Sequence, residues 1–272
     1  MEPLVTVLIS SYNQGAYISE CLNSVLNQSY KNLQVIVVDD GSQDDTLEIL
    51  QSCEDERVTA LTTEKNTAFR LYEIAEKEIQ GKYVAELASD DRWTLDKIKK
   101  QVDFLESHGS IGAVFSWCEV LTPDLNEKER LEKIFNVQNR EMHEWFRELI
   151  VEGNKFNNPS VMFRTEVFQK YGGYRFQYRQ LQDLELWLRM LPNETIYVMP
   201  EKLTYYMCIL RIKLGILVQP QWIIWYGWIQ KCLIFFLMFS GIQMEIFLIV
   251  PFQENWKGIC HWKMRISYAK NF

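Results

Sequence analysis

The sequence is poor in the residue types that mark several protein classes. Its 272 residues include only 12 Gly and 7 Pro, which excludes collagen-like and low-complexity chains. Its six Cys form no C-x-x-C pair and it has only three His, so a Cys/His zinc site has little support, and reduced, buried thiols are expected. No basic region followed by a long apolar stretch opens the chain, so we expect no signal peptide.

Charge and aromatic residues divide the chain into two unlike parts. The net charge is −7, which argues against a protein that coats nucleic acid. Residues 208–272 contain seven Lys or Arg and two Glu, a net charge of +5, which leaves −12 for residues 1–207. The same C-terminal stretch contains five of the nine Trp. We therefore expect a domain at residues 1–207 and a basic, Trp-rich hydrophobic tail at residues 208–272.

Short buried strands alternate with amphipathic helices along residues 1–207. Residues 4–9 and 34–38 are apolar runs without alternation, typical of strands covered on both faces. The pattern predicts further strands at 58–62, 82–87 and 112–117, and helices at 16–28, 43–51, 69–79, 96–106 and 182–189. Such alternation indicates an α/β fold with a parallel sheet, whose ligand crevice lies beyond the carboxyl ends of the strands.

Two acidic pairs follow predicted strands, Asp39-Asp40 and Asp90-Asp91. Like charges in one crevice repel unless a cation or hydrogen-bond donors compensate them. Mg²⁺ and Mn²⁺ bind carboxylates together with substrate phosphates, and such an ion can neutralise a leaving diphosphate. A single pair could equally be a turn or a helix cap. Two pairs at equivalent positions favour a binding site, and the lack of a Gly-rich loop excludes P-loop and dinucleotide sites.

Five segments match, in order, the motifs of one enzyme family. They are VTVLISSYN (5–13), VVDDGSQDDT (37–46), GKYVAELASDDRW (81–93), DKIKKQVDFL (96–105) and QDLELWLR (182–189). Together they resemble the family-2 glycosyltransferases, inverting enzymes with the GT-A fold, and the likeness extends from residue 4 to about residue 206. The resemblance implies a Rossmann-like, mostly parallel central sheet flanked by helices.

The same resemblance assigns roles to single residues. Asp183 would be the general base that takes the proton from the acceptor hydroxyl, and Asp91 would bind the divalent metal, Mn²⁺ or Mg²⁺. In the nucleotide site of the donor, Ser10, Tyr12 and Asp40 would contact the base and ribose. Asp39 would support that loop, and Asp90 would lie at the ribose and diphosphate. Two assignments have structural alternatives, since Tyr12 could be a core aromatic and Asp183 could cap its helix.

Three positions depart from the family pattern. Ala88 replaces the first Asp of the common D-x-D motif, which weakens the metal assignment. Gln182 replaces the Glu that usually precedes the base, and this removes one negative charge beside Asp183. Members commonly have an Arg-x-His element near the diphosphate after the position of Tyr206, but here no His follows until His261. One phosphate-binding element is therefore missing.

Residues 208–272 allow several interpretations. Trp222, Trp225 and Trp228 share one helical face, and the longest uncharged runs, 214–230 and 232–244, are shorter than the roughly 20 residues of a membrane span. A helical segment lying on an anionic membrane surface fits as well. An ordinary packing helix and a changed reading frame after Met207 stay open.

These observations lead us to expect a cytoplasmic enzyme, associated with the inner face of the membrane through its tail. It would transfer a sugar from a UDP-sugar or another nucleotide-diphosphate sugar to a glycan or a lipid-linked acceptor during cell-surface polysaccharide synthesis. One alternative is a sugar nucleotidyltransferase, although residues 10–15 lack the Lys or Arg that its loop needs. Another is a nucleotide-binding or membrane-docked partner protein that has lost catalysis.

Overall fold

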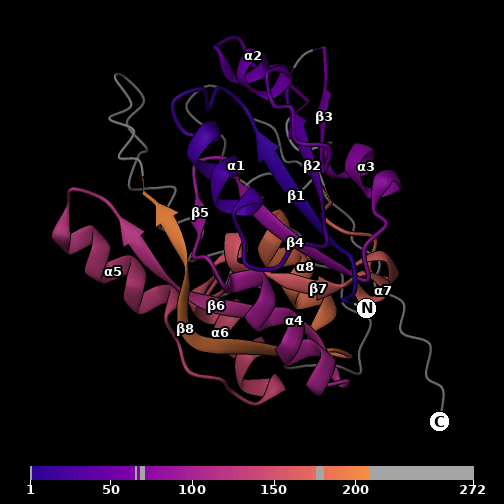
Figure 1. The fold of residues 1–272 in the computed structure, drawn as a ribbon. Coiled ribbons are helices and arrows are strands. Elements are labelled where there is room, and N and C mark those ends of the chain that lie inside the picture. The colour runs from indigo at the N-terminus through magenta and orange to yellow at the C-terminus, as the bar shows by residue number, and fades with distance from the viewer. Residues whose placement is uncertain (1, 65, 68–70, 176–180, 209–272) are drawn as a thin grey trace, which may run out of the picture.

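A mixed sheet runs through the part of the chain that the computed structural model describes, residues 2–64, 66–67, 71–175 and 181–208 (Figure 1). Its eight strands within these residues are arranged in the order β3-β2-β1-β4-β7-β6-β8-β5. Their bounds are β1 Val5–Ser11, β2 Leu33–Asp39, β3 Val58–Thr62, β4 Tyr83–Ala88, β5 Arg92–Trp93, β6 Ile111–Leu121, β7 Met162–Arg164 and β8 Thr195–Met207. The predicted α/β class is confirmed.

The first four strands form the parallel half of the sheet. In the centre of β1, Val7 lies opposite Val35 of β2 and Ala85 of β4, and all three side chains are fully buried. This burial on both sides explains the apolar runs in the sequence. The other half is mixed, because β7 runs antiparallel to β4 and β6, β8 parallel to β6, and β5 antiparallel to β8.

Helices cover both faces of the sheet. Their bounds are α1 Ile18–Leu26, α2 Thr46–Gln51, α3 Leu71–Ala75, α4 Lys97–Ser107, α5 Leu125–Phe135, α6 Met142–Glu152, α7 Thr165–Lys170 and α8 Gln182–Met190, with 3₁₀ turns η1 Glu76–Glu78 and η2 Asn158–Ser160. One core packs α1 and α4 on β1, and a second packs α6 and α8 on β6 and β7. Trp187 of α8 is fully buried in this second core. The predicted helices at 16–28 and 43–51 begin later than expected, at Ile18 and Thr46.

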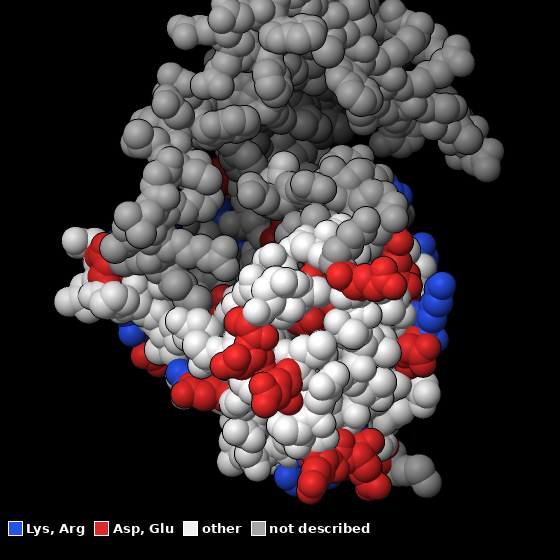
Figure 2. Space-filling view, turned by 90° about the horizontal axis from the view of Figure 1, so that it is seen from above, with Lys and Arg blue, Asp and Glu red and all other residues white. Residues whose placement is uncertain are grey.

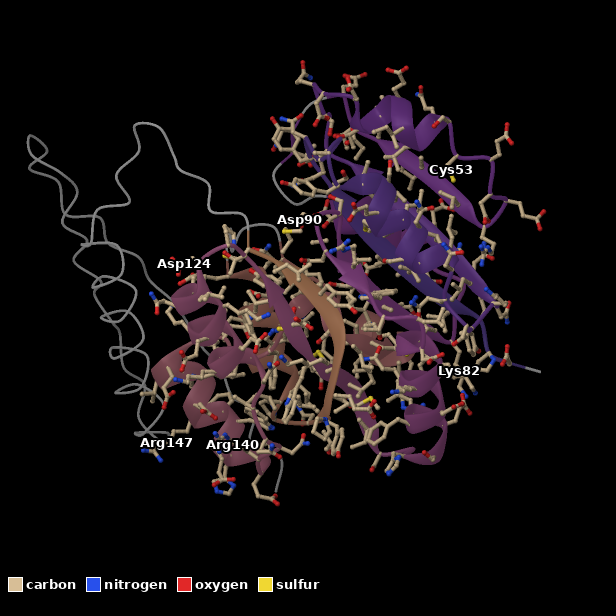
Figure 3. The ribbon with its side chains drawn as sticks, turned by 60° about the vertical axis from the view of Figure 1, so that its left-hand side comes forward. Cys53, Lys82, Asp90, Asp124, Arg140 and Arg147 are labelled. Carbon is tan, nitrogen blue, oxygen red and sulfur yellow. The ribbon has the colours of Figure 1, made fainter. Side chains whose placement is uncertain are left out.

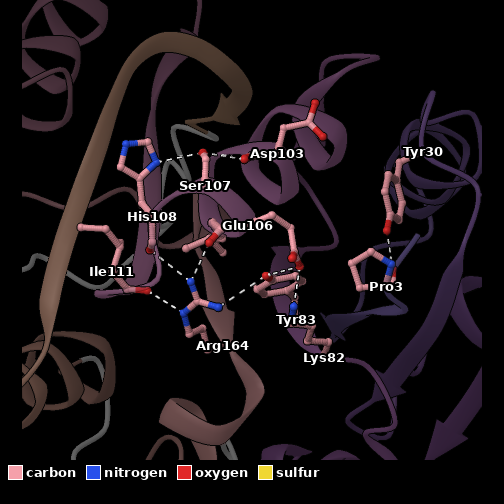
Figure 4. Close-up of polar contacts among 11 residues, drawn as sticks. Pro3, Tyr30, Lys82, Tyr83, Asp103, Glu106, Ser107, His108, Ile111 and Arg164 are labelled. Carbon is pink, nitrogen blue, oxygen red and sulfur yellow. Dashed lines mark hydrogen bonds and ion pairs between the residues drawn. The ribbon is translucent and has the colours of Figure 1, made fainter. Parts of the chain in front are cut away.

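A polar cluster links several strands near Tyr83, the first residue of β4 (Figure 4). Arg164 donates through Nε to the carbonyl of Ile111 at 2.8 Å and through Nη2 to that of Leu105 at 2.6 Å. Glu106 accepts a hydrogen bond from the Tyr83 hydroxyl at 2.7 Å. The cluster thus joins β4, β6 and β7 to the end of α4 and fixes their register.

Gly81 allows the backbone to pass unusually close to β1 just before β4 begins. Its N–H donates to the Thr6 hydroxyl at 2.9 Å. A Cβ atom on Gly81 would lie 2.5 Å from the backbone nitrogen of Thr6 and 2.9 Å from the carbonyl oxygen of Leu4. Only glycine fits this position without moving a strand.

Two expectations from the sequence concern the end of the chain and the charge. The tail assigned to 208–272 lies, apart from Cys208, outside the described residues. Within the described ranges no helix is both long and apolar enough to cross a membrane. Among the charged side chains of the described surface in Figure 2, acidic ones predominate, as the net charge of residues 1–207 leads one to expect.

Candidate active site

The carboxyl ends of β1, β2 and β4 bring most of the predicted site residues to one edge of the sheet. Ser10 lies opposite Val38 of β2 and Ala88 of β4. Its carbonyl accepts a hydrogen bond from Ser89 N at 3.1 Å, and Asp40 N donates to the carbonyl of Ser11 at 2.8 Å. Asp90 lies at this same edge (Figure 3). The sheet register therefore places the loops after β1, β2 and β4 next to one another.

The loops after β1 and β2 are joined into one unit. Asn13 N donates to Ser42 Oγ, and Gln43 N donates to Asn13 Oδ1, each at 2.8 Å. Asn13 has a φ of 52°, a left-handed conformation that Asn tolerates better than most residues. Tyr12 is 40% exposed, so the alternative of a core aromatic is wrong. Its ring is available to contact a ligand.

The two carboxylates at the carboxyl end of β2 are buried and accept hydrogen bonds from hydroxyl and amide groups. Asp39 accepts hydrogen bonds from the amide of Ser42 at 3.0 Å and from its hydroxyl, so it supports the turn that follows β2. Asp40 is 3% exposed and its Oδ1 accepts from the amide and the hydroxyl of Thr67 at 2.8 and 2.7 Å. These contacts fit a supporting role for Asp39. They fix Asp40 firmly at the edge of the sheet.

The second acidic pair combines a partly exposed and a buried carboxyl. Asp91 is 2% exposed, and its Oδ1 accepts from Met207 N at 2.6 Å, at the end of β8. Burial and the nearby charge of Asp90 raise the pKa of Asp91 well above its usual range. A divalent cation would relieve both effects, because it would compensate the two negative charges.

Asp90 and Asp91 are the candidate ligands for a divalent metal. No group of three or more His, Cys, Asp or Glu among the residues described could hold a metal ion. The protein would thus supply the adjacent carboxylates of Asp90 and Asp91, with diphosphate and water completing the shell. Magnesium is commonly bound in this way, so the donor set fits.

Asp183 lies in the first turn of α8. Its Oδ1 accepts from Leu184 N and its Oδ2 from Asn154 Nδ2, both at 2.7 Å. Asp183 does not cap the helix, because the N-cap residue of α8 is Leu181 and no side chain caps it. The Asn154 contact comes from outside the helix. Burial raises the pKa of Asp183, although these hydrogen bonds lower it. A carboxylate with a raised pKa is a better proton acceptor than an ordinary one.

Sequence analysis missed Glu86, a further carboxyl close to Asp183. Glu86 lies within β4 and is 1% exposed. Burial raises its pKa, the nearby polar groups of Tyr174 and Asn158 lower it, and the charge of Asp183 raises it, to about 8 overall. The only signal in the sequence is one acidic residue inside an otherwise apolar strand, YVAELA.

Comparison with known proteins decides the family. The model of glycosyl transferase family 2 matches residues 6–172, more than half of the chain. The chain belongs to this family. The resemblance of the five sequence segments to this family is therefore confirmed. Three of the segments begin inside the matched range, one begins a single residue before it, and the segment at 182–189 lies beyond it.

Similar proteins of known name are also glycosyltransferases. This family-2 glycosyltransferase is 43% identical over 107 residues to TuaG of Bacillus subtilis, which is named as a teichuronic acid biosynthesis glycosyltransferase. It is 37% identical over 108 residues to WfaP of Escherichia coli, named as a UDP-Glc:alpha-D-GlcNAc-diphosphoundecaprenol beta-1,3-glucosyltransferase. Each match covers 38% of this chain and 42% of the relative. The aligned region thus spans about two fifths of each relative.

Solved structures share the fold at low sequence identity. TarS of S. aureus, in complex with UDP-GlcNAc, matches with a TM-score of 0.63 and 18% identity, over 88% of this chain and 68% of that one. The mannosyltransferase PcManGT from Pyrobaculum calidifontis, in complex with GDP-Man and Mn²⁺, matches with a TM-score of 0.58 and 19% identity, over 79% and 59%. At such identities the likeness supports the fold of the family-2 glycosyltransferase.

Proposed function

We propose that this protein transfers a sugar from a UDP-sugar to a hydroxyl of a glycan or lipid-linked acceptor, with inversion, during cell-surface polysaccharide synthesis. The observation that carries the proposal is the joined pair of loops after β1 and β2, which lies next to the Asp90–Asp91 pair. The loops offer Tyr12 and Asp40 to a nucleotide, and the acidic pair lies where a diphosphate would follow.

Each residue then has a chemical task. Asp183 accepts the proton of the acceptor hydroxyl while the acceptor oxygen bonds to the anomeric carbon. The bond from that carbon to the diphosphate breaks in the same step, and UDP leaves with the electron pair, which inverts the anomeric centre. A divalent ion held by Asp90 and Asp91 would neutralise the charge that develops on the diphosphate.

The comparisons support the choice of donor and acceptor without deciding it. TarS binds UDP-GlcNAc, and the name of WfaP gives UDP-Glc as donor and a diphosphoundecaprenol-linked sugar as acceptor. A lipid-linked acceptor would be met at the inner membrane surface, so we retain the cytoplasmic location and the membrane contact through residues 208–272 as predictions. The nucleotide sugar in PcManGT is GDP-Man, with Mn²⁺. Both UDP and GDP must therefore be tested.

The first experiment is a thermal-shift panel of UDP, GDP, CMP and dTDP, each with and without Mn²⁺. A ligand at 100 times its Kd adds about 2.7 kcal/mol of stability. We expect UDP to stabilise the protein when Mn²⁺ is present, and Asp91→Asn to remove most of this stabilisation because it takes away one ligand of the ion. The matched control is Asp103→Asn, an exposed carboxylate on α4, which should behave as the wild type.

Two results would contradict this assignment. Stabilisation by UDP that Asp91→Asn leaves unchanged would show that the ion binds elsewhere. Stabilisation by UDP without any release of UDP from UDP-glucose or UDP-GlcNAc would favour the binding-only protein, an alternative that Ala88 and the missing Arg-x-His element support.

A further inference from the structure

Glu86 is a buried carboxyl for which the proposed transfer reaction has no use. Its Oε2 accepts a long hydrogen bond from Asn158 Nδ2, at 3.4 Å, and its Oε1 has no hydrogen-bond partner among the described residues. The Tyr174 hydroxyl donates to Asn158 Oδ1 at 2.8 Å and so turns the Asn158 amide towards Glu86. An ionised carboxylate in such a place would be poorly compensated.

Asp183 is the contrasting carboxyl. Each of its oxygens accepts a hydrogen bond of 2.7 Å, one from a backbone amide and one from Asn154. Among the described residues, Asp183 is also the carboxylate whose charge acts on Glu86. Because a buried and a half-buried carboxylate that act on each other cannot both be ionised cheaply, the negative charge belongs on the better hydrogen-bonded one, Asp183, and the proton on Glu86.

The other groups around Glu86 do not change this balance. The residue opposite it on β1 is Leu8, and its backbone N–H donates to the carbonyl of Val161 beside β7, so both strands present apolar residues. The segment after α7 contributes Tyr174 and η2 contributes the neutral Asn158. Within the described part of the chain, no Lys or Arg forms an ion pair with Glu86.

We propose that Glu86 is a positioning residue that forms a coupled pair with Asp183, in which Glu86 holds the proton and Asp183 the negative charge. The inference rests on the proposed function, in which Asp183 is the base. With Glu86 neutral, the pair carries a single negative charge, which lies on Asp183. When Glu86 ionises, near pH 8, the second charge opposes binding of the diphosphate.

The variant that tests the pair is Glu86→Gln, because an amide copies the neutral carboxyl in shape. At pH 7 we expect UDP release from the UDP-sugar that the enzyme uses to stay within about threefold of the wild type. The wild-type kcat/KM should fall above pH 8 through a rise in the KM of the donor, and this fall should be absent from Glu86→Gln. Glu166→Gln, an exposed carboxyl on α7, is the matched control and should keep the wild-type profile.

A second measurement needs no substrate. The folded state holds a proton on Glu86 up to about pH 8, whereas the unfolded chain loses it near pH 4.3. The contribution of Glu86 to the stability of the fold is fully present below pH 4.3 and is lost as the pH rises to 8. The unfolding constant of the wild type relative to Glu86→Gln should therefore rise about tenfold for each pH unit between 5 and 8, and stay level above 9. Urea denaturation measures both proteins.

The outcomes separate this inference from the proposed function. If Glu86→Gln loses a hundredfold or more of its activity at pH 7, the charge on Glu86 is needed and the pair is wrong. If the kcat/KM of Glu86→Gln falls above pH 8 as that of the wild type does, the inference is overturned. It is overturned too if the ratio of the two unfolding constants does not depend on pH. Both results would leave the proposed transferase function intact. The expected pH-dependent ratio without any UDP release would instead contradict the proposed function, and the location of the proton would stand.

Discussion

Asp183→Asn should abolish sugar transfer while leaving the protein folded and able to bind UDP. The substitution removes the proton acceptor, and the loss of a general base costs about 10²- to 10⁴-fold in rate. The amide can still accept from Leu184 N or Asn154 Nδ2, so one of the two 2.7 Å contacts is retained. UDP release measures the rate, and a UDP titration followed by thermal shift measures the affinity.

The control for this variant is Asp103→Asn on α4, which makes the same chemical change on an exposed helix face. Its rate and its UDP affinity should equal those of the wild type. In the wild type, activity should fall on the acid side at a pH above the ordinary range of Asp, because burial raises the pKa of Asp183. Transfer at a near wild-type rate in Asp183→Asn would mean that another group is the base.

Gly81→Ala should destabilise the fold by about 3 kcal/mol, because the new methyl group overpacks a tight contact between β1 and the start of β4. Its Cβ would lie 2.5 Å from Thr6 N, 2.7 Å from the carbonyl oxygen of Tyr83 and 2.9 Å from that of Leu4. All three are backbone atoms, so no side chain can rotate away. Urea denaturation at neutral pH would measure the loss.

Gly109→Ala is the matched control, since a Cβ atom there has no heavy atom within 4 Å. It should leave the free energy of unfolding within about 1 kcal/mol of the wild type, because only the freedom of the unfolded chain changes. If both variants lose the same stability, the loss does not come from the close contact with Thr6.

The parallel half of the sheet could be predicted because the residues within each strand are enough to indicate that the strand is buried. The run from Val5 to Ile9 is buried at every position, so its apolar character alone indicates a strand covered on both faces. The sequence pattern does not predict the long strand β8, Thr195–Met207. It contains Pro200, Glu201 and Lys202, and its pairing with β6 changes register near Trp117. A strand interrupted in this way has no clean pattern in the sequence.

Some residues of the candidate site could likewise be predicted from local sequence, and one could not. Asp39 and Asp40 lie at the end of β2, and Asp90 and Asp91 follow β4 after one residue. A local pattern and the rule for parallel sheets are therefore enough to group them. Glu86 could not be found that way. Its environment is made by Asn158, Tyr174 and Asp183, which follow it by 72 residues or more, and only the tertiary fold brings them to β4.

The bond from Met207 N to Asp91 also has a consequence for synthesis of the chain. The two residues are 116 positions apart, so a nascent chain can pair β1 to β4 long before β8 has left the ribosome. Until then Asp91 lacks its backbone donor and β5 lacks the strand with which it pairs. Contacts of such sequence separation form slowly. The loops after β1 and β2 should therefore reach their final conformation first during translation. The Asp90–Asp91 pair should gain its final surroundings only when β8 packs against the sheet.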